Sequence, residues 1–168
     1  RPLHVCRRLV SRVLLVLVCL SGLAKADYNF DSTTGTITGY TGAGGAVVIP
    51  ASIDGTPVTA IGDLAFSPDY RGIQSITSVT IPNSVTSIGD GAFAGCSGLQ
   101  GVYFLGNPPS SNFGANAFAG ATAATVYYLP GTTGWNASYA ERPTALWRLP
   151  YPLILDFGPS FGLRTNRF

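Results

Sequence analysis

The feature that most constrains this chain is an internal repeat. Three copies of a hexapeptide, IGDLAF, IGDGAF and FGANAF, end at Phe66, Phe93 and Phe118, which are 27 and then 25 residues apart. A period of this length is typical of solenoids, in which each copy forms one coil and equivalent side chains stack. We therefore predict a stacked column of these three phenylalanines, inside a core that no single repeat could form alone.

A second set of matches has the alternation of a β-strand. The segments AVVIP, SVTIP, VYFLG and VYYLP begin at residues 46, 78, 102 and 126. Successive side chains of a strand point to opposite faces, so alternation divides each segment into core residues and outward residues. The residues predicted to face the core are Val47, Ile49, Val79, Ile81, Val102, Phe104, Val126 and Tyr128. Those predicted to face outward are Val48, Thr80, Tyr103 and Tyr127.

Two further segments complete the expected architecture. Residues 27–40 alternate apolar side chains around the turn-rich stretch DSTTG, which predicts a β-hairpin that closes the first edge of the coil, within an N-terminal cap at residues 27–45. Between the strands, residues 92–99 have apolar spacing that suits a short helical turn, with Cys96 and Leu99 facing the core. The fold predicted from these patterns is a strand-dominated solenoid with short helical turns.

Both ends of the chain differ from the repeats. Residues 1–26 carry arginines, an apolar run at 13–20 and an Ala-Lys-Ala site, which together indicate a secretory signal peptide. The run is far shorter than the roughly 18 to 20 residues that a spanning helix needs. The chain contains no methionine, so we expect a fragment at its start. Residues 148–168 are proline-rich and then alternating, which predicts a linker and the start of a truncated β region.

Charge and cysteine content change once the predicted signal peptide is set aside. The remaining residues hold five basic and eight acidic side chains, a net charge of −3. A mildly acidic chain with scattered arginines lacks the basic patch that nucleic acid binding requires, so we expect no nucleic acid partner. Cys96 is the one cysteine left, and it cannot form an internal disulfide, so we expect packing alone to hold the fold.

Catalytic and cofactor motifs are missing from the sequence beyond residue 26. The single histidine, His4, lies in the predicted signal peptide, which excludes Ser-His-Asp and Cys-His nucleophile systems and histidine-bearing zinc sites. Cys96 occupies a repeat position that predicts a small buried hydrophobic residue rather than a reactive thiol. Asn136-Ala137-Ser138 is a formal glycosylation sequon, to which we give little weight. We predict no enzyme activity, no cofactor and no metal.

Asp63 and Asp90 hold the same position in successive copies of the hexapeptide. Neighbouring strands lie about 4.8 Å apart, so the two carboxylates could approach to roughly that distance. Such a pair resembles the carboxylates of a retaining glycosidase, about 5 Å apart, and it could equally contribute oxygens to a calcium ion. The interpretation we favour is structural: each aspartate caps backbone N–H groups at a turn, and Ala115 replaces it in the next copy.

Taken together, the motifs resemble a known family. The pattern V-x-I-P-x-S-V-x-x-I-G-x-x-A-F-x-G-C-x-x-L is similar to the BspA-type leucine-rich repeats of bacterial secreted and surface proteins. The likeness covers residues 46–126, with variant forms at 102–109 and 126–135, and residues 142–147 resemble the end of such an array. The resemblance implies a curved, strand-lined solenoid used for binding or adhesion, which we place at residues 46–147.

The functional hypothesis is an exported, non-catalytic binding or adhesion module that contacts a protein or polysaccharide at the cell surface or outside the cell. Its predicted partner surface is Tyr103 and Tyr127, with Trp135 at the rim, because large amphipathic rings are favoured at interfaces. The structural alternative is a tyrosine ladder that only stabilises the sheet. Two other functions remain open: a stalk that displays another domain, and a glycan-active enzyme that uses Asp63 and Asp90. The sequence leaves the oligomeric state and the anchoring mode undecided.

Overall fold

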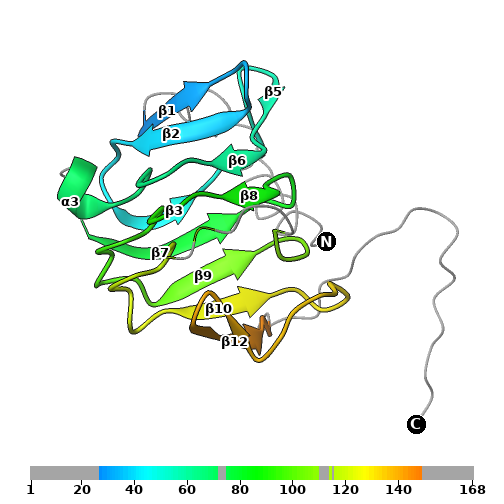
Figure 1. Ribbon diagram of the computed structural model, residues 1–168. Coiled ribbons are helices and arrows are strands. Elements are labelled where there is room, and N and C mark those ends of the chain that lie inside the picture. The colour runs from blue at the N-terminus through cyan, green and yellow to red at the C-terminus, as the bar shows by residue number, and fades with distance from the viewer. Residues whose placement is uncertain (1–26, 72–74, 110–113, 115, 149–168) are drawn as a thin grey trace, which may run out of the picture.

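The computed structural model describes residues 27–71, 75–109, 114 and 116–148. Two rows of short strands run through it, one behind the other, and successive repeats lie one below the next (Figure 1). The predicted signal peptide and residues 149–168 of the predicted C-terminal region lie outside the described residues. The fold is therefore an array of strands in which the first two repeats contribute a strand to both rows and the later ones to one row.

The first row is a six-stranded sheet with the order β11-β12-β10-β9-β7-β3. Its strands are β3 (Gly45–Val48), β7 (Ile76–Ile81), β9 (Gly101–Phe104), β10 (Thr125–Tyr128), β11 (Ser138–Tyr139) and β12 (Arg142–Leu146). All of its pairs are parallel except β11 with β12. The register aligns Val47, Val79, Val102 and Val126, so the predicted strand column and its inward valines are confirmed.

The second row is a four-stranded sheet with the order β1-β2-β6-β8. Its strands are β1 (Tyr28–Asp31), β2 (Thr36–Tyr40), β6 (Ala60–Ile61) and β8 (Ser87–Ile88). The antiparallel pairing of β1 with β2 confirms the predicted hairpin. Strand β2 also pairs in parallel with β6, and this pairing aligns Ile37 with Ile61. The hairpin is thus both the cap and the first member of the second row.

The turn of this hairpin is held by one carboxylate. Asp31 accepts hydrogen bonds from the backbone N–H and the hydroxyl of Thr33, at 2.9 and 2.6 Å, and from the hydroxyl of Thr34 at 2.9 Å. These donors, the Thr33 hydroxyl first, hold the pKa of Asp31 below its ordinary value because they stabilise the charged form. The turn-rich residues DSTTG therefore form the predicted turn by local hydrogen bonding.

The first repeat is the longest, and its extra residues form small elements outside the two rows. Strands β4 (Ser52–Ile53) and β5 (Thr56–Pro57) pair in antiparallel fashion around Asp54 and Gly55, which both have positive φ. The helix α3 (Pro68–Arg71) lies at the opposite turn. Insertions at turns leave the stacking of the strands intact because their backbone groups can reach water.

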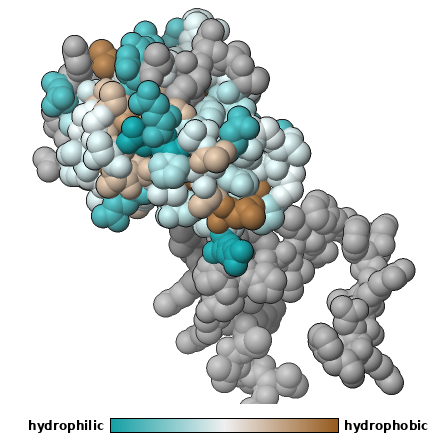
Figure 2. Space-filling view, turned by 60° about the horizontal axis from the view of Figure 1, so that its bottom comes forward, coloured by the Kyte–Doolittle hydropathy of each residue, from teal (hydrophilic) through white to brown (hydrophobic). Residues whose placement is uncertain are grey.

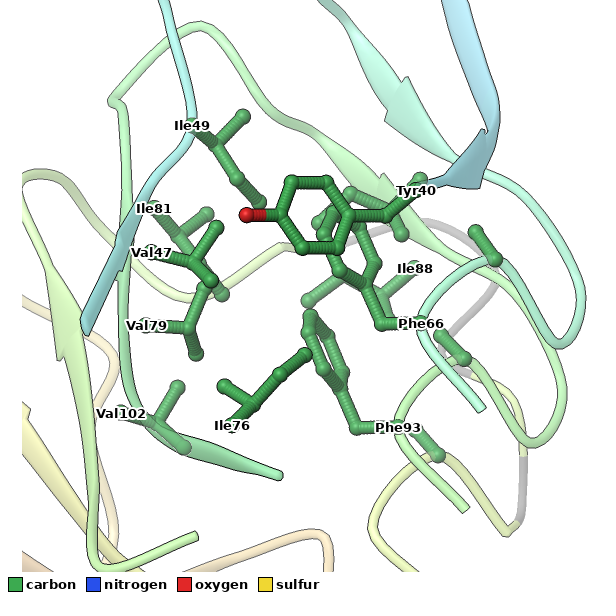
Figure 3. Packing of buried hydrophobic residues seen from close by; sticks show 14 of the residues in the cluster. Tyr40, Val47, Ile49, Phe66, Ile76, Val79, Ile81, Ile88, Phe93 and Val102 are labelled. Atoms are coloured by element: carbon green, nitrogen blue, oxygen red, sulfur yellow. The ribbon is translucent and has the colours of Figure 1, made fainter. Parts of the chain in front are cut away.

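The core lies between the two rows and contains the predicted aromatic column (Figure 3). The rings of Phe66 and Phe93 stack with centroids 4.9 Å apart and planes 17° apart. Those of Phe93 and Phe118 stack at 5.3 Å and 14°, and Tyr40 extends the column at 5.2 Å from Phe66. The three phenylalanines are at most 2% exposed. The repeat period therefore does create the stacked core that the sequence predicts.

The glycine of the hexapeptide is explained by how closely the repeats approach one another. A Cβ atom added to Gly89 would lie 2.3 Å from the Asp63 Oδ1 atom and 2.6 Å from the Asp63 backbone nitrogen. A Cβ atom at Gly114 would lie 2.3 Å from the Asp90 Cα atom. No side chain fits at these distances, so only glycine lets adjacent repeats pack backbone against backbone at this turn.

The expected short helical turn at residues 92–99 is wrong. This segment forms non-helical turns, although Cys96 and Leu99 are buried as predicted. The reason is that two of its N–H groups bond outside the segment: Phe93 donates to the Ala117 carbonyl and Gly95 to the Ala119 carbonyl, both at 2.8 Å. Hydrogen bonds to the next repeat take the donors that a helix would use internally.

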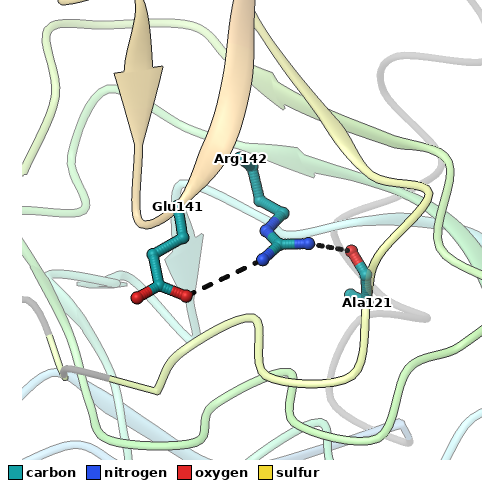
Figure 4. A network of polar contacts seen from close by, with 3 residues as sticks. All are labelled: Ala121, Glu141 and Arg142. Atoms are coloured by element: carbon teal, nitrogen blue, oxygen red, sulfur yellow. Dashed lines mark hydrogen bonds and ion pairs between the residues drawn. The ribbon is translucent and has the colours of Figure 1, made fainter.

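The C-terminal end of the described array is closed by the β11–β12 hairpin. Arg142, at the start of β12, donates from Nη1 to the Ala121 carbonyl at 3.2 Å and forms an ion pair with Glu141 at 3.8 Å (Figure 4). The guanidinium thus ties the hairpin to the turn of the preceding repeat. No helix in the described ranges is long and apolar enough to cross a membrane.

Candidate binding surface

The outer face of the six-stranded sheet carries the residues that alternate with the core valines. The register aligns Val48 with Thr80, Thr80 with Tyr103, Tyr103 with Tyr127, and Tyr127 with Ala145. Val48 is 53% exposed, and the side chains of Thr80, Tyr103 and Tyr127 are half-buried. The predicted inward and outward sides of the strands are therefore confirmed, and the two tyrosines adjoin as expected.

The two tyrosines form a stacked pair. Their ring centroids lie 5.0 Å apart and their planes differ by 12°. This separation matches the roughly 4.8 Å between neighbouring strands, so the rings stand side by side on β9 and β10. The ring of Tyr103 lies back along its own strand, where a Cβ atom at Gly101 would approach Tyr103 Cε2 to 2.7 Å. Gly101 therefore leaves the space that the Tyr103 ring occupies.

A tryptophan outside the predicted partner surface joins this pair. Trp147 directly follows β12, and its backbone N–H donates to the Tyr128 carbonyl at 2.7 Å. Its ring centroid lies 4.8 Å from that of Tyr103, with 49° between the ring planes. Strand alternation could have predicted this position, because Trp147 lies two residues after Ala145, which is the register partner of Tyr127. We refer to Tyr103, Tyr127 and Trp147 as the aromatic face.

The expected place of Trp135 at the rim of this face is wrong. Its ring stacks on Tyr128 with centroids 5.2 Å apart and planes 8° apart, and it lies 5.0 Å from Phe104, which is a core residue. Both partners point to the inner side of the sheet. The loop that precedes it contains Gly131 and Gly134, with φ of 89° and 87°, and these left-handed residues turn the chain back under the strand ends. Trp135 therefore covers the core of the last repeat.

Asp63 and Asp90 link successive repeats. The Asp63 Oδ1 atom accepts a hydrogen bond from the backbone N–H of Asp90 at 2.8 Å, and the Asp90 Oδ1 atom accepts one from the N–H of Asn116 at 3.1 Å. The favoured interpretation, that these aspartates bind backbone N–H groups, is confirmed, but the donors belong to the next repeat rather than to the same turn. Within the described ranges, no three His, Cys, Asp or Glu side chains cluster as a metal site would require.

Cys96 lies in the core, as its repeat position predicts. Its thiol donates a hydrogen bond to the Phe66 carbonyl at 3.3 Å. Burial, with a smaller contribution from the negative charge of Asp69, raises the pKa of the thiol to about 12. The reactive form of cysteine is the thiolate, so Cys96 is protonated and unreactive near neutral pH in the folded chain.

Parallel strands stacked repeat upon repeat, with a column of apolar side chains between two rows, define a leucine-rich-repeat type of fold. Residues 52–139 match the sequence model of the BspA type Leucine rich repeat region in six copies. This match spans more than half of the chain, so the protein belongs to the BspA-type leucine-rich-repeat family. The family assignment made from the repeat motifs is thereby confirmed.

One solved structure with a related description is a leucine-rich-repeat protein of T. pallidum, TpLRR. It is 24% identical over 60% of this chain and 67% of its own, with a TM-score of 0.39. No curated protein matches the chain. The family match therefore carries the assignment.

Proposed function

We propose that this protein is an exported, non-catalytic binding or adhesion module whose partner contacts the aromatic face. The single observation that carries the proposal is the stacked, half-exposed pair Tyr103 and Tyr127 on the outer side of the sheet, with Trp147 beside it. Members of the leucine-rich-repeat family typically serve as protein-binding or adhesion modules. The features of residues 1–26 support export.

The geometry of the pair favours binding for an energetic reason. Tyrosine and tryptophan offer a large contact area with few rotatable bonds, so they lose little side-chain entropy when a partner covers them. Stacking orders the two tyrosine rings before any partner arrives, which reduces that entropy cost further. The competing explanation is a cross-strand ladder that only stabilises the sheet, and a stalk that displays another domain would need no more than that.

The glycosidase-like role of Asp63 and Asp90 has less support. One oxygen of each carboxylate accepts a backbone N–H group of the next repeat, at 2.8 and 3.1 Å. Losing such a bond would weaken the contact between repeats, so both carboxylates are explained by structure. We therefore assign the aspartates to stability and the aromatic face to function.

The decisive experiment compares the wild type with a Tyr103→Ser/Tyr127→Ser double mutant on a panel of matrix proteins and polysaccharides. Val48→Ser is the matched control, because Val48 is exposed on the same face but lies two strands away from Tyr103. We expect the double mutant to lose at least one interaction that the control retains. If a folded double mutant keeps every interaction of the wild type, the pair is structural only and the proposal is wrong.

A further inference from the structure

A shallow groove of about 420 Å³ lies where the strands of the six-stranded sheet end, on the loops that follow β7, β9 and β10. Its lining comes from three successive repeats, so the groove crosses the strands rather than following one of them. Its lining includes Asn83, Leu105, Asn107 and Pro108. Backbones pack closely here too, since a Cβ atom at Gly106 would lie 2.9 Å from the Asn83 Cα atom.

The chemistry of this groove is polar and uncharged. Among the described residues that line it there is no Asp, Glu, Lys or Arg. The side chains of Asn83 and Asn107 are both exposed. Asn107 accepts the Thr133 N–H at Oδ1, at 2.9 Å, which leaves its amide N–H groups as donors. Carboxamides both donate and accept, so they match ligands that carry hydroxyl groups.

The groove and the aromatic face meet along the chain at the end of β9. Leu105 lines the groove, is 41% exposed, and lies two residues after Tyr103, so alternation places both side chains on the outer side of the sheet. The Leu105 N–H donates to the Ile81 carbonyl at 3.0 Å, which continues the strand ladder to this point. Leu105 and Pro108 provide apolar surface beside the amides.

We propose that this groove binds a neutral polysaccharide, with the chain running across the repeats from loop to loop. The proposal rests on the proposed function, because it names the partner of the same outer surface. A neutral glycan combines hydroxyl groups with apolar C–H faces, and the groove combines amides with leucine and proline side chains. Equivalent loops recur at about the 4.8 Å strand spacing, which gives a repeating ligand a repeating set of contacts.

Charge distinguishes this groove from a second one at the opposite turn, which contains Asp63 and Asp90. Carboxylates there would repel acidic sugars, whereas the uncharged groove has no partner for a uronate or sulfate group. The lack of charged side chains in the described lining favours a neutral ligand.

The test measures binding of the full chain to dextran, mannan and laminarin, with alginate and heparin as acidic counterparts, by affinity electrophoresis and calorimetry. The variants are Asn83→Ala, Asn83→Asp and the Tyr103→Ser/Tyr127→Ser double mutant. Gln100→Ala is the control, because Gln100 is an exposed carboxamide that precedes β9 at the other end of the strand. We expect at least one neutral polysaccharide to bind, with affinity reduced about fivefold by Asn83→Ala and unchanged by Gln100→Ala.

The outcomes separate this inference from the proposed function. Binding of an acidic polysaccharide alone, or binding of a neutral one that neither Asn83 variant weakens, would overturn the groove assignment. A protein partner that depends on the two tyrosines, with no neutral polysaccharide bound, would leave the proposed function standing and refute the glycan. If the tyrosine double mutant binds every protein and polysaccharide as well as the wild type does, the proposed function itself is refuted.

Discussion

The phenylalanine column and the tyrosine pair are two aromatic stacks with nearly the same geometry. Phe93 and Phe118 lie 5.3 Å apart at 14°, and Tyr103 and Tyr127 lie 5.0 Å apart at 12°. The first stack is almost completely buried, whereas the second is half-exposed. The repeat alone therefore dictates stacking on both sides of the structure. Burial, rather than ring geometry, distinguishes a stack that holds the fold from one that is open to a partner.

The largest expected effect is on the buried stack. Phe93→Ala should lower the free energy of unfolding by about 3 to 5 kcal/mol, because it removes buried area and leaves a cavity in the middle of the column. Coupling between repeats should spread the damage beyond the mutated one. Chemical denaturation measures the loss. Thr80→Ala, on the outer face, is the control and should cost little; equal losses for the two variants would contradict the assignment of inner and outer faces.

A second strong effect is expected at the glycine of the hexapeptide. Gly89→Ala should destabilise by about 1 to 3 kcal/mol, because its Cβ atom would collide with the backbone of Asp63. Gly62→Ala tests the same motif position in the first copy, where the nearest atom, the Ile37 carbonyl oxygen, is 3.2 Å away. In thermal denaturation, the melting temperature of Gly89→Ala should therefore be well below that of Gly62→Ala. Similar melting temperatures would mean that contact between repeats does not explain the glycine.

A smaller effect is expected from the aspartate that bridges repeats. Asp90→Ala should cost about 1 kcal/mol, because it removes the acceptor for the Asn116 N–H group in an exposed setting. Asp90→Asn keeps an amide oxygen at the same place and should remain close to the wild type. Denaturation of both variants, measured side by side, checks the bridge. If asparagine destabilises as much as alanine, the negative charge matters rather than the hydrogen bond.

Much of the structure could be predicted because it depends on spacing. The steps of 27 and 25 residues determine the phenylalanine column, and strand alternation determines which valines are buried. The prediction of a helical turn at residues 92–99 is wrong because the N–H groups of Phe93 and Gly95 bind the next repeat, which local apolar spacing does not reveal. The predictions for the family and for the outer face were therefore accurate where periodicity holds.

The two tryptophans show where periodicity ends. Trp135 follows a loop with two left-handed glycines, and that loop turns its ring onto the inner residue Tyr128. Trp147 keeps the alternation of β12 and reaches Tyr103, although it lies just beyond the strand. Loop conformation depends on backbone dihedral angles rather than on apolar pattern, so the pattern alone predicts the wrong tryptophan beside the tyrosines.

The exposed stack should matter little for stability. The Tyr103→Ser/Tyr127→Ser double mutant loses the tyrosine pair and the contact of Tyr103 with Trp147, and cross-strand pairs contribute about 0.2 to 1 kcal/mol each. Its melting temperature should therefore stay close to that of the wild type and far above that of Phe93→Ala. A loss as large as that of Phe93→Ala would show that the outer stack holds the fold just as the inner one does.

The smallest expected effect is that of calcium on the aspartate bridges. A metal that binds only the native state raises the free energy of unfolding by RT ln(1 + [L]/Kd), so even a site half-saturated at millimolar calcium would add about 0.4 kcal/mol. Calcium takes six to eight oxygen ligands, whereas Asp63 and Asp90 each already direct one carboxylate oxygen to a backbone N–H group. Thermal denaturation in millimolar calcium, compared with magnesium and with a chelator, should therefore give one melting temperature in all three conditions. A rise that is specific to calcium and lost in Asp90→Asn would mean that these carboxylates bind a metal in preference to the backbone of the next repeat.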